Sequence, residues 1–120
     1  MRIYIEYGDK RQGFAFPMST IKIQDVLDRM NIRNGTDVRF SFSSYDQYSL
    51  FGTEQKRWFT GDIYKLNLFA ERYEVELEYS EQAALKSVLR EHPDSSIDDM
   101  LMMTYGIESV TAIPCYNTEC

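Results

Sequence analysis

Residues 60–80 read TGDIYKLNLFAERYEVELEYS, and this stretch separates a sheet-forming part of the chain from a helical part. Before it, apolar residues alternate with polar ones as they do in strands, whereas after Gly61 they recur at helical spacing. The helical stripe is formed by Leu66, Phe69, Ala70 and Tyr73. We therefore expect a helix over residues 63–74, with Asp62 as its N-cap.

Negative charge is concentrated in and after this stretch. Residues 1–61 hold nine Lys/Arg against seven Asp/Glu, a balance of +2, whereas residues 62–120 hold four against twelve, a balance of −8. Such a contrast between halves indicates an interaction role for the acidic half. The ordinary alternative is a solvated helical surface that keeps the protein soluble.

Three segments upstream have the pattern of strands, namely RIYIEY (2–7), GFAFPM (13–18) and VRFSF (38–42). GDKRQG (8–13) is a turn signal, which predicts an antiparallel hairpin from the first two. A helix capped by Ser19 or Thr20 is predicted next, ending before Asn34-Gly35. Its buried face would consist of Ile23, Val26, Leu27 and Met30.

Residues 43–61, SSYDQYSLFGTEQKRWFTG, fit either a long loop or an irregular hairpin. We expect the aromatic side chains of this segment to pack across the sheet, since large apolar groups are usually buried.

Two further helices and a strand are predicted after residue 78. Ser80-Glu81 opens one helix, which His92-Pro93 ends because the residue before proline avoids helical geometry. Ser95 and Asp98 have the spacing of a capping box for the next helix, and Gly106 is predicted to end it. ESVTAIP (108–114) then has the pattern of a strand.

These elements predict an α+β protein: a small antiparallel sheet with one helix, an acidic three-helix segment and a C-terminal strand. The predicted units are residues 1–61, 62–106 and 107–120, the last being the start of a truncated third part. We expect a cytoplasmic protein, since no apolar run approaches the roughly 18–20 residues of a membrane span. Cys115 and Cys120 are expected to be reduced thiols.

Catalytic residue patterns are absent from the sequence, so we expect a protein that is not an enzyme and has no cofactor. His92 is the only histidine, and its place before a proline favours a helix C-terminus over a catalytic role. Asp98 and Asp99 are adjacent on an expected helix and would point apart, which disfavours a metal site.

Direct nucleic-acid binding is also disfavoured. Lys56-Arg57-Trp58-Phe59 interleaves cations with aromatic rings as single-strand binders do, and Arg29, Arg33 and Arg39 could extend it. The patch is short, however, and the acidic chain as a whole repels phosphate. We prefer the interpretation that the aromatic rings of this segment are packed in the core and that its charged groups are solvated.

The helical half contains the pattern L-N-x-x-A-E-R (66–72), an acidic link, A-L-x-x-x-L (84–89), a break and a new acidic helix. This order resembles the middle of the ArdA-type antirestriction proteins of conjugative elements. The first strand and Gly13-Phe14-Ala15-Phe16-Pro17 are similar to the opening hairpin of that family. The resemblance covers about residues 3–110.

The resemblance implies a DNA mimic that occupies the DNA-binding site of a type I restriction-modification enzyme. Carboxylates would stand where phosphates do, since residues at helical i, i+3 and i+4 lie roughly 5–6 Å apart. The candidate carboxylates are Glu71, Glu74, Glu76, Glu78, Glu81, Glu91, Asp94, Asp98 and Asp99.

Two departures from the family pattern leave alternatives open. The link VELEYSEQ is less charged than the family's usual run, and the third, acidic part is nearly absent, which leaves open whether the chain forms the family's homodimer. The rival hypothesis is a small protein-interaction module of a mobile element that uses the aromatic segment 45–59. It predicts that Tyr48, Phe51 or Trp58 matters for binding.

Overall fold

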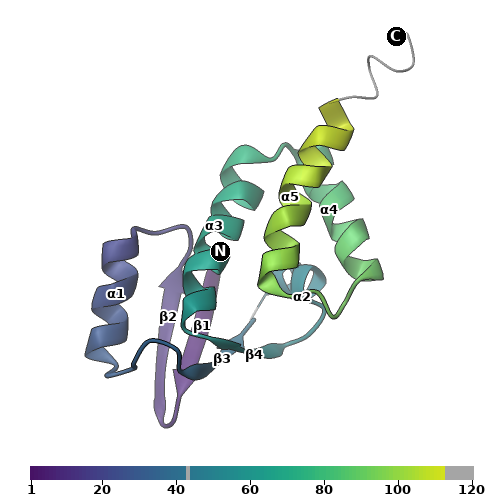
Figure 1. Cartoon of the computed structure of the whole chain (residues 1–120). Helices are drawn as coiled ribbons and strands as arrows, with labels where there is room; N and C mark the ends of the chain where they lie inside the picture. The colour runs from purple at the N-terminus through teal and green to yellow at the C-terminus, as the bar shows by residue number, and fades with distance from the viewer. Residues whose placement is uncertain (43, 113–120) are drawn as a thin grey trace, which may run out of the picture.

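The computed structural model describes the backbone of residues 1–42 and 44–112, and the side chains of these residues up to 107. The fold is α+β, as predicted (Figure 1). In the described part, no helix combines the length and apolar character needed to cross a membrane. Cys115 and Cys120 lie outside the described residues.

Among the described residues, four antiparallel strands form one sheet in the order β2-β1-β3-β4. They are β1 (Arg2–Tyr7), β2 (Lys10–Ala15), β3 (Asp37–Ser41) and β4 (Gln55–Phe59). The predicted hairpin is present, but its turn is shorter than residues 8–13, because Tyr7 already pairs with Lys10. Gly8 makes this tight turn possible, since its φ of +62° favours glycine.

The first helix, α1 (Thr20–Arg29), begins as predicted at Ser19, whose hydroxyl accepts a hydrogen bond of 3.2 Å from the Lys22 N–H. Within segment 43–61, the described residues 44–61 form neither a loop nor an irregular hairpin. They contain α2 (Tyr45–Phe51), capped by the Ser44 hydroxyl, and then β4. Gly52, with φ of +72°, ends α2 and turns the chain into β4.

The central helix, α3 (Gly61–Glu71), continues directly into a π-helical turn, η1 (Arg72–Glu76). Its start differs from the prediction: Asp62 lies inside the first turn, where its carboxylate accepts a hydrogen bond from the Phe59 N–H. The wider turn is closed by the Leu77 N–H bonding to the Arg72 carbonyl, five residues back. It buries Arg72 and Tyr73 side by side and leaves residues 74–76 exposed.

The last two helices are α4 (Tyr79–Glu91) and α5 (Ile97–Ala112). α4 ends at His92 as predicted. The capping residue of α5 is Ser96, not Ser95, since Ser96 and Asp99 exchange hydrogen bonds. The prediction that Gly106 ends this helix is wrong, and so is the strand predicted at 108–114, because α5 continues through residue 112. Residues 113 and 114 lie outside the described part.

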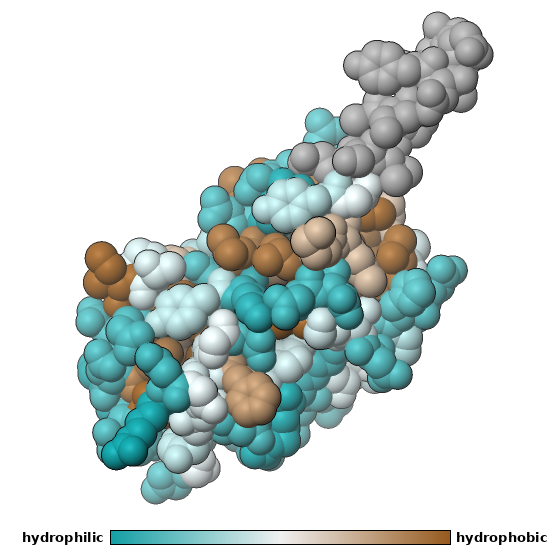
Figure 2. Space-filling view, in the orientation of Figure 1, coloured by the Kyte–Doolittle hydropathy of each residue, from teal (hydrophilic) through white to brown (hydrophobic). Residues whose placement is uncertain are grey.

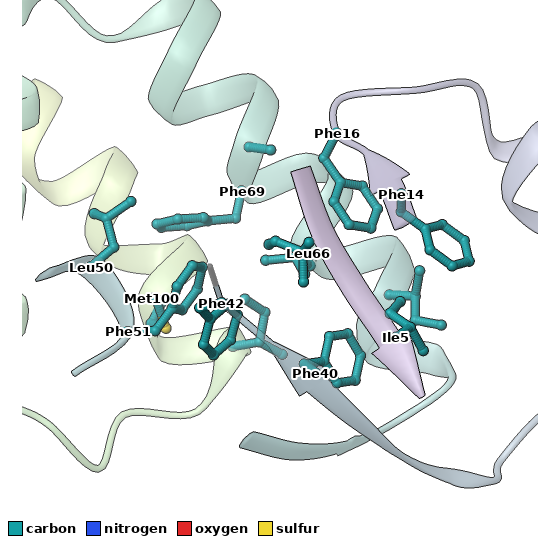
Figure 3. Packing of buried hydrophobic residues seen from close by; sticks show 14 of the residues in the cluster. Ile5, Phe14, Phe16, Phe40, Phe42, Leu50, Phe51, Leu66, Phe69 and Met100 are labelled. Atoms are coloured by element: carbon teal, nitrogen blue, oxygen red, sulfur yellow. The ribbon is translucent and has the colours of Figure 1, made fainter. Parts of the chain in front are cut away.

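Figure 3 shows how the core joins the sheet to the helices: Ile5 and Phe40 of the strands face Leu66 of α3. The predicted stripe of Leu66, Phe69, Ala70 and Tyr73 is buried in full. Phe51 and Phe69 bring α2 against α3, with ring centroids 6.0 Å apart. One continuous apolar cluster therefore runs from the sheet to α5.

Candidate functional site

The carboxylates of α3 and η1 have three different environments. Glu71 is exposed and contacts no cation among the described residues. Glu74 forms an ion pair with the N-terminal ammonium of Met1. Glu76 lies 2.6 Å from the guanidinium of Arg72. Two of these three charges are therefore partly neutralised within the fold.

The carboxylates of Glu78 and Glu81 cap the start of α4. The side chain of Glu78 accepts a hydrogen bond from the Glu81 N–H, and that of Glu81 accepts one of 2.7 Å from the Glu78 N–H. Glu81 is only 8% exposed. This reciprocal box satisfies two N–H groups that would otherwise lack partners at the helix start.

The remaining four carboxylates lie around the α4–α5 connection. Glu91 and Asp94 are exposed and form no hydrogen bond or ion pair with any other described side chain. Asp98 is 63% exposed but lies 3.0 Å from the ammonium of Lys65, whose pKa it raises through this hydrogen bond. Asp99 caps α5. The structure thus leaves Glu71 and Glu91 as outward charges without an internal partner among the described residues. Asp94 is also exposed, but its charge acts on Lys56, whose pKa it raises against the larger, opposite effect of burial.

Most of the L-N-x-x-A-E-R pattern is structural. Leu66 and Ala70 are fully buried, and the Asn67 amide forms two hydrogen bonds with the backbone of Met18. Arg72 is 5% exposed and anchors α5, because its guanidinium donates to the Thr104 hydroxyl at 3.2 Å and to the Thr104 carbonyl at 3.1 Å. Glu71 is the only residue of the pattern's named positions that faces solvent.

Exposed apolar side chains also occur on α3 and α5. Leu68 is 52% exposed, and Met102 is 68% exposed. Figure 2 shows brown, hydrophobic atoms among teal ones on this face of the molecule. The helical half is therefore not a uniformly charged surface.

The aromatic segment 45–59 divides between core and surface. Phe51 is 2% exposed and Trp58 is partly buried against the core, so neither is available as a free contact residue. Tyr45 and Tyr48 of α2 are 87% and 48% exposed. Of Tyr48, Phe51 and Trp58, the structure leaves only Tyr48 outward, and in the rest of the segment Tyr45 and Phe59 are also exposed.

The cationic pattern Lys56-Arg57-Trp58-Phe59 is split by strand alternation. Lys56 and Trp58 point to the side of Phe40 and Val38, their register partners in β3, which are buried. Burial lowers the pKa of Lys56. Arg57 points to the opposite side, where its register partner is Arg39. The four residues Lys56 to Phe59 therefore do not form one continuous binding surface.

The sheet face opposite the core is open; we call it the arginine face. Its residues, given by strand register, are Arg2, Tyr4, Glu6, Arg11, Gly13, Ala15, Asp37, Arg39, Ser41, Gln55, Arg57 and Phe59. None of these residues is buried. Sequence reasoning missed most of them, although the alternation of Arg2, Tyr4 and Glu6 between buried isoleucines places them together on the outer face of β1.

Glu6 lies at the centre of the arginine face. Its carboxylate accepts hydrogen bonds of 2.6 Å from Arg39 and 2.9 Å from the Ser41 hydroxyl, and Arg11 approaches it at 3.7 Å. The hydrogen bond from Arg39 is the main reason that the pKa of Glu6 is lowered from its ordinary value of 4.5. Arg57 pairs with Asp37 at 3.2 Å.

Two shallow hollows meet at Glu6. One, of about 270 Å³, includes Tyr7, Arg39 and Arg57 in its lining. The other, of about 520 Å³, extends from Arg11 toward Tyr45 and Tyr48. In the described part of the chain, no group of three or more His, Cys, Asp and Glu side chains is arranged to hold a metal ion.

Comparisons of the chain with profiles of known protein families, with curated proteins and with solved structures find no match.

Proposed function

We propose that the protein is a non-catalytic DNA mimic that inhibits a type I restriction-modification enzyme by occupying its DNA-binding site. The observation that supports this most directly is the imbalance of available charge in the helical half. Three of the four cations in residues 62–107, namely Lys65, Arg72 and Lys86, are held in ion pairs. Glu71, Glu91 and Asp94 remain outward, so a partner meets mainly negative charge.

The proposed mechanism is electrostatic. Duplex DNA carries about one negative charge per 1.7 Å of axis, and enzymes that bind it present matching cations. Carboxylates on α3, at the end of α4 and before α5 would be attracted to those cations and would steer the protein into the DNA channel. Because such attraction is screened by salt, inhibition should weaken steeply as ionic strength rises.

The experiment is a restriction assay with a purified type I enzyme and an increasing concentration of the protein. The test variant combines Glu71→Gln, Glu91→Gln and Asp94→Asn. The matched control combines Asp9→Asn, Asp25→Asn and Glu54→Gln, which removes the same number of exposed carboxylates from the sheet half. At about 1 kcal/mol per lost contact, the test variant should need about 100-fold more protein for half-inhibition.

The control variant should inhibit as the wild type does. Cleavage that is unchanged by folded wild-type protein, across several type I enzymes at low salt, would contradict the proposed function. Equal weakening by the test and control variants would contradict the assignment of the carboxylates.

A further inference from the structure

The arginine face contains a row of charged residues that runs across all four strands. Arg11 of β2 is the register partner of Glu6 in β1, Glu6 is the partner of Arg39 in β3, and Arg39 is the partner of Arg57 in β4. Neighbouring strands lie about 4.8 Å apart, so the row is about 14 Å long. It contains three guanidinium groups and one carboxylate, in a chain whose net charge is −6.

The second row on this face is suited to flat ligands. It consists of Gly13, Tyr4, Ser41 and Gln55, which are also partners across the four strands. Rows on one face of a sheet are about 7 Å apart along the strands. The guanidinium of Arg11 lies 4.1 Å from the centre of the Tyr4 ring, which joins the two rows.

Arg2 adds a fourth cation beside the second row. A Cβ atom at Gly13 would lie 2.9 Å from the Nε of Arg2 and 3.1 Å from the Tyr4 ring. Glycine at this position therefore lets Arg2 lie close to the surface of the sheet. Together the two rows and Arg2 carry four arginines, against the carboxylates of Glu6, of Asp37 in the adjacent row and of Glu54 in the lining of the larger hollow. Arg11 and Arg39 contact Glu6, and Arg57 contacts Asp37, but the three arginine side chains are still 57%, 42% and 66% exposed. Their outer N–H groups therefore face solvent, unlike the buried guanidinium of Arg72 in the helical half.

Exposed aromatic rings flank the arginine face. Tyr45 and Tyr48 line the larger hollow with Arg11, and Tyr7 lines the smaller one with Arg39 and Arg57. The large exposed aliphatic side chains of the described residues are on the helices and η1 instead, at Ile21, Leu68, Val75 and Met102. A surface with arginine and aromatic rings but no large aliphatic anchor suits stacking and charge contacts better than it suits an apolar peptide.

We propose that the arginine face binds single-stranded nucleic acid, with phosphates along the Arg11–Arg39–Arg57 row and bases stacking on the exposed rings of Tyr45 and Tyr48. Arginine contacts to the backbone and base stacking on aromatic side chains are the usual elements of such binding. A single strand fits because its bases are free to turn toward the tyrosines, whereas those of a duplex are paired.

This inference differs from the expectation, drawn from the sequence, that the chain makes no direct contact with nucleic acid. That expectation considered Lys56 and Trp58 together with Arg57, whereas the strand register places Arg57 with Arg39 and Arg11 instead. The same expectation was also based on the net negative charge of the whole chain. The face in question lies on the side of the sheet opposite the core and has its own positive balance.

The test is fluorescence anisotropy of a labelled 20-nucleotide oligo(dT) titrated with the protein at 50 and 200 mM NaCl. The first variant combines Arg39→Gln and Arg57→Gln. Its control combines Arg29→Gln and Arg33→Gln, which are exposed cations outside this face. A second variant combines Tyr45→Ala and Tyr48→Ala. Circular dichroism establishes that each variant is folded.

The arginine variant should bind at least tenfold more weakly at 50 mM NaCl, with a salt dependence reduced by about 0.7 per lost phosphate contact. The tyrosine variant should also lose at least tenfold, since one stacked base contributes about 1–3 kcal/mol. The control should stay within twofold of the wild type.

Three results would overturn the inference: no binding of oligo(dT) at 50 mM NaCl, an equal loss in the arginine variant and its control, or tighter binding of a duplex. Poly-glutamate that binds as tightly as oligo(dT) would also overturn it and would indicate an acidic protein partner. No restriction enzyme is used, so the outcome is separate from that of the proposed inhibitory function.

Discussion

The side-chain amide of Asn67 forms two hydrogen bonds with the backbone of Met18. Its oxygen accepts from the Met18 N–H and its nitrogen donates to the Met18 carbonyl, both at 2.8 Å. The two residues are 49 positions apart in the chain. This pair fixes the segment between β2 and α1 against α3. It also gives the asparagine of L-N-x-x-A-E-R a structural role.

Replacing Asn67 with leucine should destabilise the fold by about 1–3 kcal/mol, because two polar groups of Met18 lose their partner next to the core. Urea unfolding followed by circular dichroism measures the change. Asn67→Asp is the informative companion, since it keeps the acceptor for the Met18 N–H but loses the donor to the Met18 carbonyl. Wild-type stability in both variants would show that the pair contributes nothing.

Replacing Arg72 with methionine should lower the free energy of unfolding by about 3 kcal/mol. The loss comes from the hydrogen bonds to Thr104 and Glu76 and from the guanidinium 4.1 Å over the Tyr105 ring. The free energy of unfolding of the Arg72→Lys variant should lie between those of the wild type and the methionine variant, since lysine keeps the charge but not the planar group of donors. Chemical denaturation of the three proteins gives the order, and a methionine variant as stable as the wild type would contradict this role.

Removing the Glu81 carboxylate by Glu81→Ala should cost about 1 kcal/mol of stability, as loss of a helix cap does. Glu81→Gln should cost less, because its amide oxygen still accepts from the Glu78 N–H. Neither change should alter restriction inhibition by the folded protein, since Glu81 is buried. A loss of inhibition at unchanged stability would instead place Glu81 in the contact surface.

The contribution of Glu6 to stability should depend on pH. Because the folded state lowers the pKa of Glu6, its stabilising effect is present above the ordinary value of 4.5 and is lost as the pH falls through the folded value. At pH 7 the Glu6→Gln variant should be about 1 kcal/mol less stable than the wild type. The melting temperatures of the two proteins, measured from pH 7 to pH 3, should begin to converge below about pH 4.5 and should meet once the pH is below the lowered pKa of Glu6. A constant difference across this range would exclude the proposed cause.

Local patterns predicted the elements whose signals are contained in a few neighbouring residues. The hairpin follows from the alternation of Ile3 and Ile5, and the end of α4 follows from His92-Pro93. The helix in segment 45–59 was harder to predict from the sequence, because α2 has only seven residues. Its core residues Leu50 and Phe51 are adjacent, so they show no helical spacing. Tertiary packing, not helical periodicity, determines that segment.

The errors near the C-terminus have a similar reason. Gly106 resembles a helix end, but glycine also occurs within a helix that packing holds in place. Thr104, which accepts and donates hydrogen bonds with Arg72 and the Leu101 carbonyl, is fully buried just before it. The chain therefore remains helical through residue 112.

The sequence alone identified the candidate carboxylates by their charge, but it could not show which of them are free to contact a partner protein. Glu74 and Asp98 look alike in sequence, yet their partners are the N-terminal ammonium and Lys65 of another helix. The arginine face was also beyond local reasoning, because Arg11, Arg39 and Arg57 come together only through strand pairing. Strand register determined the arginine face, whereas packing between distant elements determined which carboxylates have partners.

The π-helical turn η1 ends in extended residues: Leu77 has ψ of 139° and Glu78 has ψ of 166°. α4 therefore starts in a new direction and does not continue the axis of α3, and the directions in which Glu91 and Asp94 point follow from the packing of α4 and α5. The same wide turn buries Arg72, which holds α5 through the Thr104 carbonyl, and leaves Glu74 and Glu76 at the surface. A change in this turn that displaced Arg72 would therefore shift α5 without altering any outward carboxylate.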